Sequence, residues 1–298
     1  MLTPPYLKTG DTIGIIAPSR STDSVSLRHS IKLFEKEGLN VVFGNNLFNK
    51  HNQFAGSDEE RAADIMDMYS NTSIKAILCA RGGYGSVRTL QHMDLQKIKT
   101  NPKWFIGYSD ITVFHSALHS LGTETIHATM PINITTEAET ENFSLLINIL
   151  KGKKLEYATD SNTLNIPGKA EGQLIGGNLS VLYSLRGTPA DIDTNGKILF
   201  IEDIDEYLYH IDRMMMNIRY GGLLQNIKGL IVGGMTDVKD NNIPFGLSAE
   251  EIILKHAADL NIPVCFGFPS GHTPKNLPLI LGRTVNLNVD GNVKLKFL

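Results

Sequence analysis

The stretch KWFIGYSDITVFHSALHSLG, residues 103–122, decides the fold of the first part of the chain. It opens on the apolar run Trp104-Phe105-Ile106, which is typical of a buried strand. After Gly107-Tyr108-Ser109-Asp110 the apolar residues return with a spacing closer to that of a helix. The stretch therefore predicts a strand that turns sharply into a helix. Ser109 at the corner is either a helix N-cap, for which serine is preferred, or a nucleophile held there for chemistry.

Strands and helices alternate on both sides of this corner. Strands are expected over 11–19, 40–44, 74–85 and 104–110. Helices are expected over 26–39, 57–71, 87–93 and 111–121. Ser57 and Glu60 have the spacing of a capping box at the start of the second helix. This alternation predicts an α/β fold with a parallel sheet that is covered by helices on both faces.

The texture of the sequence changes after about residue 138. Residues 153–177 are polar, rich in glycine and poor in strand patterns, so we place the connection between two domains there. Beyond it, strands are expected over 196–205, 227–237 and 262–272, helices over 179–187, 209–224 and 248–260, and a hairpin over 284–298. The predicted organisation is a first domain over 1–138, a connecting segment over 139–170 and a second domain over 171–298.

Composition limits the classes of function. The chain has 298 residues, 42% of them hydrophobic, and a net charge of −3, which supports one or two cored domains and argues against nucleic-acid or membrane binding. The two cysteines, Cys79 and Cys265, lie in apolar runs and are expected to be buried, reduced thiols. Residues 1–19 do not have the pattern of a signal peptide. We therefore expect a cytoplasmic globular protein.

Three residues at the ends of predicted strands form a set suited to acyl transfer. They are Ser109, Glu202 and His272. Ligands bind outside the carboxyl ends of strands in open α/β sheets, so these residues can converge there. The chain order serine, acid, histidine is that of α/β-hydrolases, although the second glycine of G-x-S-x-G is absent. Taken singly, Glu202 also fits a surface or salt-bridged acid and His272 an ordinary loop histidine.

Two further motifs carry weaker signals. The glycines of ARGGYGS, residues 80–86, let backbone N–H groups point at an oxyanion, or form a phosphate loop or a tight turn. The run lacks the Lys-Ser/Thr of a P-loop. His115 and His119 lie four residues apart on one helix face and could form a metal pair, although core or solvated histidines are the more common interpretation.

Several motifs taken together resemble one family. GDTIGIIAPS, AGSDEERAADI, ARGGYGSVR, FIGYSDITVFHSAL, EGQLIGGNLSVL, ILFIEDIDEYLYHIDRMM, GLIVGGMTD and FGFPSGH follow one another from one end of the chain to the other. In this respect the chain resembles the serine-type LD-carboxypeptidase family, which includes muropeptide LD-carboxypeptidases and microcin C immunity peptidases. The resemblance implies an N-terminal Rossmann-like α/β domain with a parallel sheet, and a C-terminal α/β domain with a small barrel-like sheet.

The resemblance also implies roles for individual residues. Ser109 corresponds to the nucleophile, Glu202 to the acid and His272 to the base of the family's triad. Backbone N–H groups of Gly82, Gly83 and Asp110 would bind the oxyanion, and Asn178 matches a position that lines the substrate pocket. Family members are typically homodimers and need no metal or cofactor.

The function implied is hydrolysis of the amide between an L-centre residue and a terminal D-amino acid. The expected substrate is a muropeptide tetrapeptide, converted to tripeptide and D-alanine in cell-wall recycling. One alternative within the fold is a microcin-immunity-like hydrolase of peptidyl or aminoacyl-nucleotide amides, although Trp104 is expected in the core rather than stacked on a base. Two others are a non-catalytic two-lobed protein that binds a small ligand and a Rossmann nucleotide enzyme that uses the glycine run.

Overall fold

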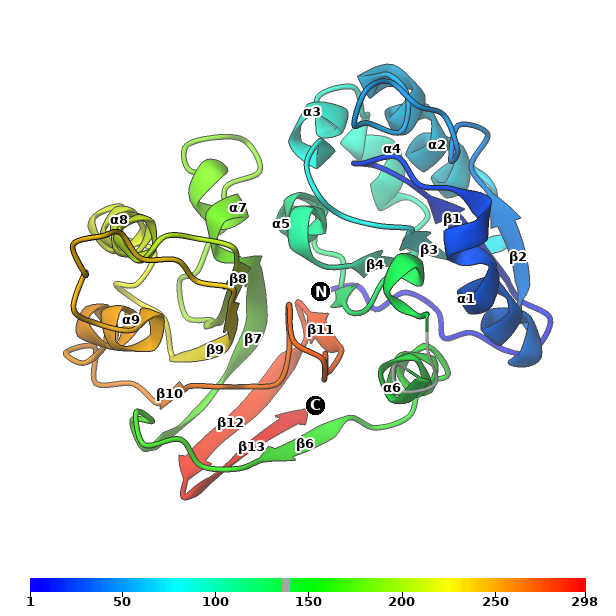
Figure 1. Ribbon diagram of the computed structural model, residues 1–298. Helices are drawn as coiled ribbons and strands as arrows, with labels where there is room; N and C mark the ends of the chain where they lie inside the picture. The colour runs from blue at the N-terminus through cyan, green and yellow to red at the C-terminus, as the bar shows by residue number, and fades with distance from the viewer. Residues whose placement is uncertain (136–139) are drawn as a thin grey trace. The chain divides into compact units, whose positions relative to one another are not determined.

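The computed structural model describes residues 1–135 and 140–298 and divides the chain into two compact units (Figure 1). The first unit comprises Met1–Lys153 and Leu277–Leu279, and the second comprises Lys154–Asn276 and Ile280–Leu298. The expected boundary between residues 138 and 139 falls outside the described residues. None of the helices in the described ranges is long and apolar enough to cross a lipid bilayer.

The first unit contains a sheet with the strand order β5-β4-β3-β1-β2, and Leu279 of β11 lies at its edge next to β5. The pairs β2–β1, β1–β3, β3–β4 and β4–β5 are all parallel, as the alternation of strands and helices predicted. The strands are β1 (Thr12–Ile16), β2 (Asn40–Phe43), β3 (Ile74–Cys79), β4 (Trp104–Gly107), β5 (Thr125–His127) and β11 (Leu279–Leu281).

Helices connect these strands and cover the sheet. They are α1 (Ser24–Lys36), α2 (Asp58–Ser70), α3 (Ser86–Leu90), α4 (Leu95–Lys99), α5 (Thr112–Ser120) and α6 (Thr140–Leu150), with 3₁₀ turns η1 (Ser109–Ile111) and η2 (Pro131–Asn133). The chain leaves β1 for β2 in one direction and then crosses back to β3, β4 and β5. Because such crossovers are right-handed, this reversal puts α1 on the face opposite α2 and α5.

The reversal also defines where a ligand is expected. In a doubly wound sheet the topological switch point lies between the two strands from which the connections diverge, here β1 and β3. The segments that leave their carboxyl ends are residues 17–23 and 80–85. The glycine run of the sequence therefore lies at the switch point, and Ser109 follows the adjacent strand β4.

The second unit contains a seven-stranded mixed sheet with the order β10-β9-β8-β7-β12-β13-β6. From β10 to β7 neighbouring strands are parallel, and from β7 to β6 they are antiparallel. The strands are β6 (Glu156–Thr159), β7 (Gly168–Asn178), β8 (Ile198–Ile204), β9 (Gly229–Thr236), β10 (Val264–Cys265), β12 (Thr284–Asp290) and β13 (Asn292–Phe297). Ile166, just ahead of β7, also pairs with Val264 of β10 through an isolated antiparallel bridge.

The parallel half of this sheet carries its own helices. These are α7 (Leu179–Ser184), α8 (Leu208–Tyr220) and α9 (Ala249–Ala257), each between two successive parallel strands. Their apolar side chains, such as Ile211, Met215 and Ile253, form one buried core with those of β8 and β9. The predicted hairpin is confirmed, with Asp290 paired to Asn292 across Gly291, which has φ +65°.

The prediction that residues 153–177 are poor in strands is wrong. They contain β6 and most of β7, an eleven-residue strand. The first half of β7 pairs with β12 and has one exposed face, so its polar residues alternate with buried ones. Its glycines serve close approach of backbones: a Cβ on Gly176 would overlap the carbonyl oxygen of Phe200 on β8. The composition of this stretch resembles that of a loop because its exposed half is polar and its closely packed half requires glycine.

The strand expected over 262–272 is also shorter than predicted. Only Val264 and Cys265 are paired as β10, and the chain then runs irregularly toward His272. Asn165 provides one reason, because its Oδ1 accepts a hydrogen bond from the N–H of Phe266 at 2.7 Å in place of a neighbouring strand. Both cysteines are buried free thiols, as expected.

The capping box at the start of α2 provides a test of local stability. Ser57 Oγ accepts from the N–H of Glu60, and Glu60 returns a bond to the N–H of Ser57. We expect Ser57→Ala to lower the free energy of unfolding by about 1 kcal/mol, measured by urea denaturation. Ser70→Ala at the other end of α2 removes only a hydroxyl bonded to a helix carbonyl and should cost less than about 0.5 kcal/mol. Equal losses would contradict the capping role.

Candidate active site

Ser109 occupies a strained corner between β4 and α5. Its φ is +66°, in the left-handed region that a non-glycine residue seldom adopts. It lies inside η1, and neither η1 nor α5 has a side-chain cap at its N-terminus. The N-cap interpretation of Ser109 is therefore wrong. A serine held on a strained strand-to-helix turn has the local geometry of a nucleophile elbow.

Two glycines make room for this corner. A Cβ on Gly107 would lie 2.9 Å from Ile111 Cγ1 and 3.2 Å from Cys79 Cβ, so only glycine lets the turn pack against β3. A Cβ on Gly82 would lie 3.1 Å from Ser109 Cβ and 3.3 Å from its Oγ. The glycine loop after β3 therefore runs directly beside the serine hydroxyl.

Asp110 fastens the corner to the two segments of the switch point. Its Oδ2 accepts from Ser19 Oγ at 2.5 Å and from the N–H of Ser86 at 2.8 Å. Ser19 and Ser86 also share a hydrogen bond between their hydroxyls at 2.8 Å. All three residues are buried. Sequence reasoning missed Ser19 and Ser86, although each follows a strand on the same edge of the sheet.

His115 supports the corner rather than a metal. One ring nitrogen, Nδ1, lies 2.8 Å from Thr125 Oγ1, and Nε2 lies 2.9 Å from the carbonyl oxygen of Gly107. Since a carbonyl only accepts, Nε2 carries the proton. Burial and the neighbouring His127 lower the pKa of His115 to about 3, so the ring is neutral. The metal-pair interpretation of His115 and His119 is wrong, and the described residues contain no metal-binding cluster.

In the second unit Glu202 and His272 form a buried acid–imidazole pair. Glu202 Oε2 lies 2.6 Å from His272 Nδ1 and accepts from the His272 N–H at 3.1 Å. Glu202 is fully buried on β8, and the His272 side chain is 14% exposed. Burial alone would lower the pKa of His272, but the hydrogen bond and charge of Glu202 outweigh it and raise that pKa. The pair fixes Nδ1 as the protonated nitrogen, so Nε2 carries the lone pair.

Glycines again fit the backbone closely around this pair. Gly271 has φ +102°, and a Cβ there would lie 2.6 Å from Glu202 Oε2. A Cβ on Gly233 would lie 2.5 Å from the carbonyl oxygen of Ser270 and 3.1 Å from Glu202 Cβ. The small residues of the GGM and PSGH motifs therefore let two loops close over the carboxylate. This close packing explains why Glu202, rather than one of the neighbouring acids, is buried in contact with His272.

Asn178 and Asp203 form a second polar pair beside the first. Asn178, the register partner of Glu202 on β7, caps α7 and donates from Nδ2 to Asp203 Oδ1 at 2.8 Å. Asp203 Oδ2 accepts from the N–H of Ser180 at 2.8 Å. Burial and the charge of Glu202 raise the pKa of Asp203 to about 7. The sequence predicted Asn178 as a site residue but not Asp203, because nothing in the sequence distinguishes Asp203 from the acids next to it.

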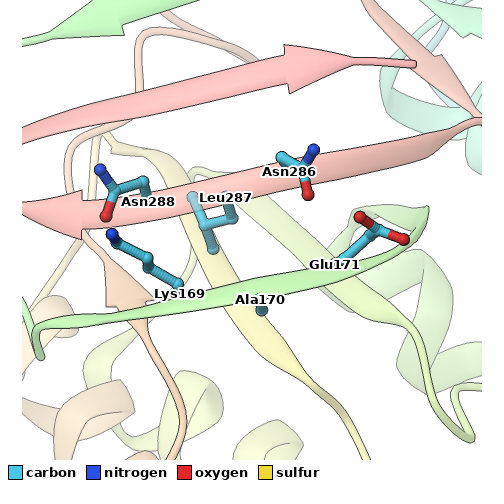
Figure 2. Close-up of a pocket in the computed structure, with 6 residues that line it drawn as sticks. All are labelled: Lys169, Ala170, Glu171, Asn286, Leu287 and Asn288. Carbon is cyan, nitrogen blue, oxygen red and sulfur yellow. The ribbon is translucent and has the colours of Figure 1, made fainter.

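A pocket of about 380 Å³ lies elsewhere in the second unit, over β7 and β12. Figure 2 shows the side chains of Asn288 and Lys169 together, and those of Asn286 and Glu171 together, along these two strands. None of the site residues expected from the sequence lines it.

The structure thus groups the expected site residues within each unit. Ser109, Gly82, Gly83 and Asp110 gather at the carboxyl edge of the first sheet. Glu202, His272 and Asn178 gather at the carboxyl ends of β7 and β8 in the second unit.

Comparisons with known proteins identify the family of the chain. The model of the LD-carboxypeptidase N-terminal domain matches residues 13–128, and that of the C-terminal domain matches residues 171–287. A probable murein peptide carboxypeptidase of Bacillus subtilis is 37% identical over 96% of this chain and 91% of its own length. The murein tetrapeptide carboxypeptidase of Pseudomonas aeruginosa is 27% identical over 94% and 93%.

Solved structures show the same fold. The muramoyltetrapeptide carboxypeptidase of Oxalobacter formigenes has a TM-score of 0.87 at 29% identity, covering 96% of this chain and 98% of that one. The microcin C7 self-immunity protein MccF has a TM-score of 0.89 at 23% identity, covering 99% and 98%, which shows the fold alone. Since the two family models together cover most of both units, the chain belongs to the LD-carboxypeptidase family.

Proposed function

We propose that this protein is a cytoplasmic serine LD-carboxypeptidase that removes the terminal D-amino acid from a muropeptide tetrapeptide in cell-wall recycling. The observation that carries the proposal is the buried Glu202 carboxylate on Nδ1 of His272, because it prepares a histidine base. The strained placement of Ser109 beside the glycine loop supplies a matching nucleophile. The named relatives from Pseudomonas aeruginosa and Oxalobacter formigenes favour a murein peptide as substrate.

The proposed reaction begins when His272 Nε2 takes the proton of Ser109. The serine Oγ attacks the carbonyl carbon of the L-centre residue, and the negative charge moves to the carbonyl oxygen. His272, now an imidazolium next to Glu202, gives its proton to the amide nitrogen, and the D-amino acid leaves. Water, activated by the same imidazole, then hydrolyses the acyl-enzyme and restores Ser109.

The oxyanion is bound by backbone N–H groups of the glycine loop and of Asp110. Gly83 has φ +114° and Gly85 φ +138°, backbone conformations that favour glycine and let the loop after β3 turn sharply. Asp110 holds its own backbone and that loop together through Ser86. Each such donor is worth roughly 10²–10³ in rate when it is fixed in advance.

The proposal includes a homodimer, as is typical of the family. Asn178 is assigned to the wall of the substrate pocket, with Asp203 holding its amide in place. No metal or cofactor takes part in the proposed steps.

Trp104 bears on the alternative substrate. It is fully buried and donates from Nε1 to the carbonyl oxygen of Pro5 at 3.0 Å, so it offers no surface to a nucleotide base. This disfavours hydrolysis of aminoacyl-nucleotide amides.

The first prediction concerns the nucleophile. We expect Ser109→Ala to reduce release of D-alanine from a cell-wall tetrapeptide by roughly 10⁴-fold or more, followed by mass spectrometry. Ser120→Ala, which removes an exposed hydroxyl at the end of α5, should retain wild-type activity. Equal activity of Ser109→Ala and wild type would reject the mechanism. Cleavage by the wild type of an aminoacyl-nucleotide amide but not of the tetrapeptide would favour the alternative substrate.

The second prediction concerns pH. A base must be neutral, and the pKa of His272 is raised from 6.5. We therefore expect kcat/KM of the wild type to fall as the pH is lowered, with the midpoint of the acid limb above 6.5. Glu202→Gln removes the carboxylate that raises this pKa. We expect the acid limb to move to lower pH and kcat to fall by roughly 10⁴-fold, because glutamine can donate to Nδ1 and select the wrong tautomer.

Glu206→Gln provides the matched control for this pH profile. Glu206 lies on another histidine, with Oε2 2.5 Å from His210 Nδ1. Its replacement should leave the acid limb where it is in the wild type. An acid limb that stays in place in Glu202→Gln as well would mean that His272 is not the group titrated.

The third prediction concerns the glycine loop. Gly82 does not have a left-handed φ, so alanine fits its backbone but crowds Ser109 Oγ. We expect Gly82→Ala to lower kcat by about 10- to 100-fold with an unchanged melting temperature. Gly83→Ala should also lower the melting temperature, because φ there is +114° and its Cβ would lie 2.5 Å from Arg20 Cδ. Full activity of Gly82→Ala would show that the loop does not border the reacting atoms.

A further inference from the structure

Two arginines lie together at the switch point of the first sheet. Arg20 follows β1, and Arg81 follows β3. Arg81 Nη1 donates to the carbonyl oxygen of Ser21 at 3.1 Å, which places its guanidinium against the backbone next to Arg20. The stem of Arg20 lies along the glycine loop, where it fills the space that a Gly83 side chain would need.

Neither arginine has a carboxylate partner among the described residues, although other arginines of the same unit do. Asp58 pairs with Arg61 and, at 2.7 Å, with Arg88. Burial and, after it, the charge of Arg20 lower the pKa of the partly buried Arg81. Two adjacent guanidinium groups without an anion repel each other, and this repulsion is relieved when an anion binds between them.

Arg81 also borders the part of the glycine loop that approaches Ser109. Arg81 and Gly83 flank Gly82, where an added Cβ would lie 3.1 Å from Ser109 Cβ. In the proposed substrate, only the amide nitrogen and one Cα separate the scissile carbonyl carbon from the terminal carboxyl carbon. From standard bond lengths, the carboxylate therefore lies within roughly 4 Å of the carbon that the serine attacks.

We propose that Arg20 and Arg81 bind the α-carboxylate of the substrate's terminal D-amino acid, an assignment that rests on the proposed function. A carboxypeptidase must distinguish a free chain end from an internal peptide bond. The planar guanidinium matches a carboxylate with two parallel hydrogen bonds, whereas a neutral amide cannot accept in this way at both positions. The pair thus restricts cleavage to the last residue.

The test compares two substrates, the tetrapeptide ending in D-alanine and the same peptide ending in D-alaninamide. We expect the wild type to prefer the free acid in kcat/KM by about 10- to 100-fold. Arg81→Ala and Arg20→Ala should each lose most of this preference, with a raised KM for the acid and little change for the amide. Arg81→Lys, which keeps the charge but not the planar fork, should recover part of it.

Arg88→Ala is the matched control, because this exposed arginine from the same segment is already paired with Asp58. It should keep the wild-type ratio of acid to amide cleavage. Calorimetry with the inactive Ser109→Ala variant adds a readout that does not depend on turnover. That variant should bind the acid about 10- to 100-fold more tightly than the amide, and the additional Arg81→Ala substitution should remove the difference.

Three outcomes would overturn the assignment. A wild type that releases the terminal residue from both substrates equally well supports the proposed function and rejects the carboxylate site alone. Arginine variants that lose acid and amide cleavage in the same proportion would show that the pair only supports the glycine loop. A wild type that cleaves neither substrate, with no binding of either by Ser109→Ala, rejects the proposed function and the carboxylate site with it.

Discussion

The buried carboxylate of Asp110 is the interaction on which the geometry of the first unit depends. It binds the hydroxyl of Ser19, 91 residues earlier, and the backbone of Ser86, 24 residues earlier. These bonds join the carboxyl ends of β1, β3 and β4. Because Asp110 directly follows Ser109, the same bonds hold the serine in its left-handed conformation. The strain of the corner persists since a buried carboxylate would lose its partners if the corner relaxed.

In the second unit, two neighbouring buried acids have different charge states and different hydrogen-bond partners. Glu202 and Asp203 are consecutive and both buried, so their charges disfavour each other. Glu202 is held by two donors of His272, whereas the pKa of Asp203 rises to about 7. The charge is thereby concentrated on the acid that faces the imidazole. Asp203 is left to organise Asn178 and the start of α7.

The arginines of the first unit that pair with a carboxylate differ in role from the two that do not. Arg61 and Arg88 share Asp58 and hold α2 against α3, which is a structural use of charge. Arg20 and Arg81 lie at the switch point without such a partner in the described part of the chain. In the proposed assignment, these two arginines supply the anion-binding group that recognises a free carboxyl terminus, at the edge where open α/β sheets bind their ligands.

Local rules were enough to predict much of this protein from its sequence. The alternating strands and helices, the capping box of Ser57 and the turn at Gly291 depend on neighbours within a few residues, and the structure confirms them. The motifs also identified the family. β7 was missed because a half-exposed strand rich in glycine has the composition of a loop until its partners β8 and β12 are known.

The sequence by itself therefore determined the fold class, the family and which residue types are available for chemistry. Only the tertiary structure decided that Ser109 is no helix cap, that His115 supports a backbone carbonyl and that Asp203 holds Asn178. The reason is physical: these roles are set by hydrogen bonds and burial between segments far apart in the chain, such as the 70 residues between Glu202 and His272. No pattern of neighbouring residues encodes such contacts.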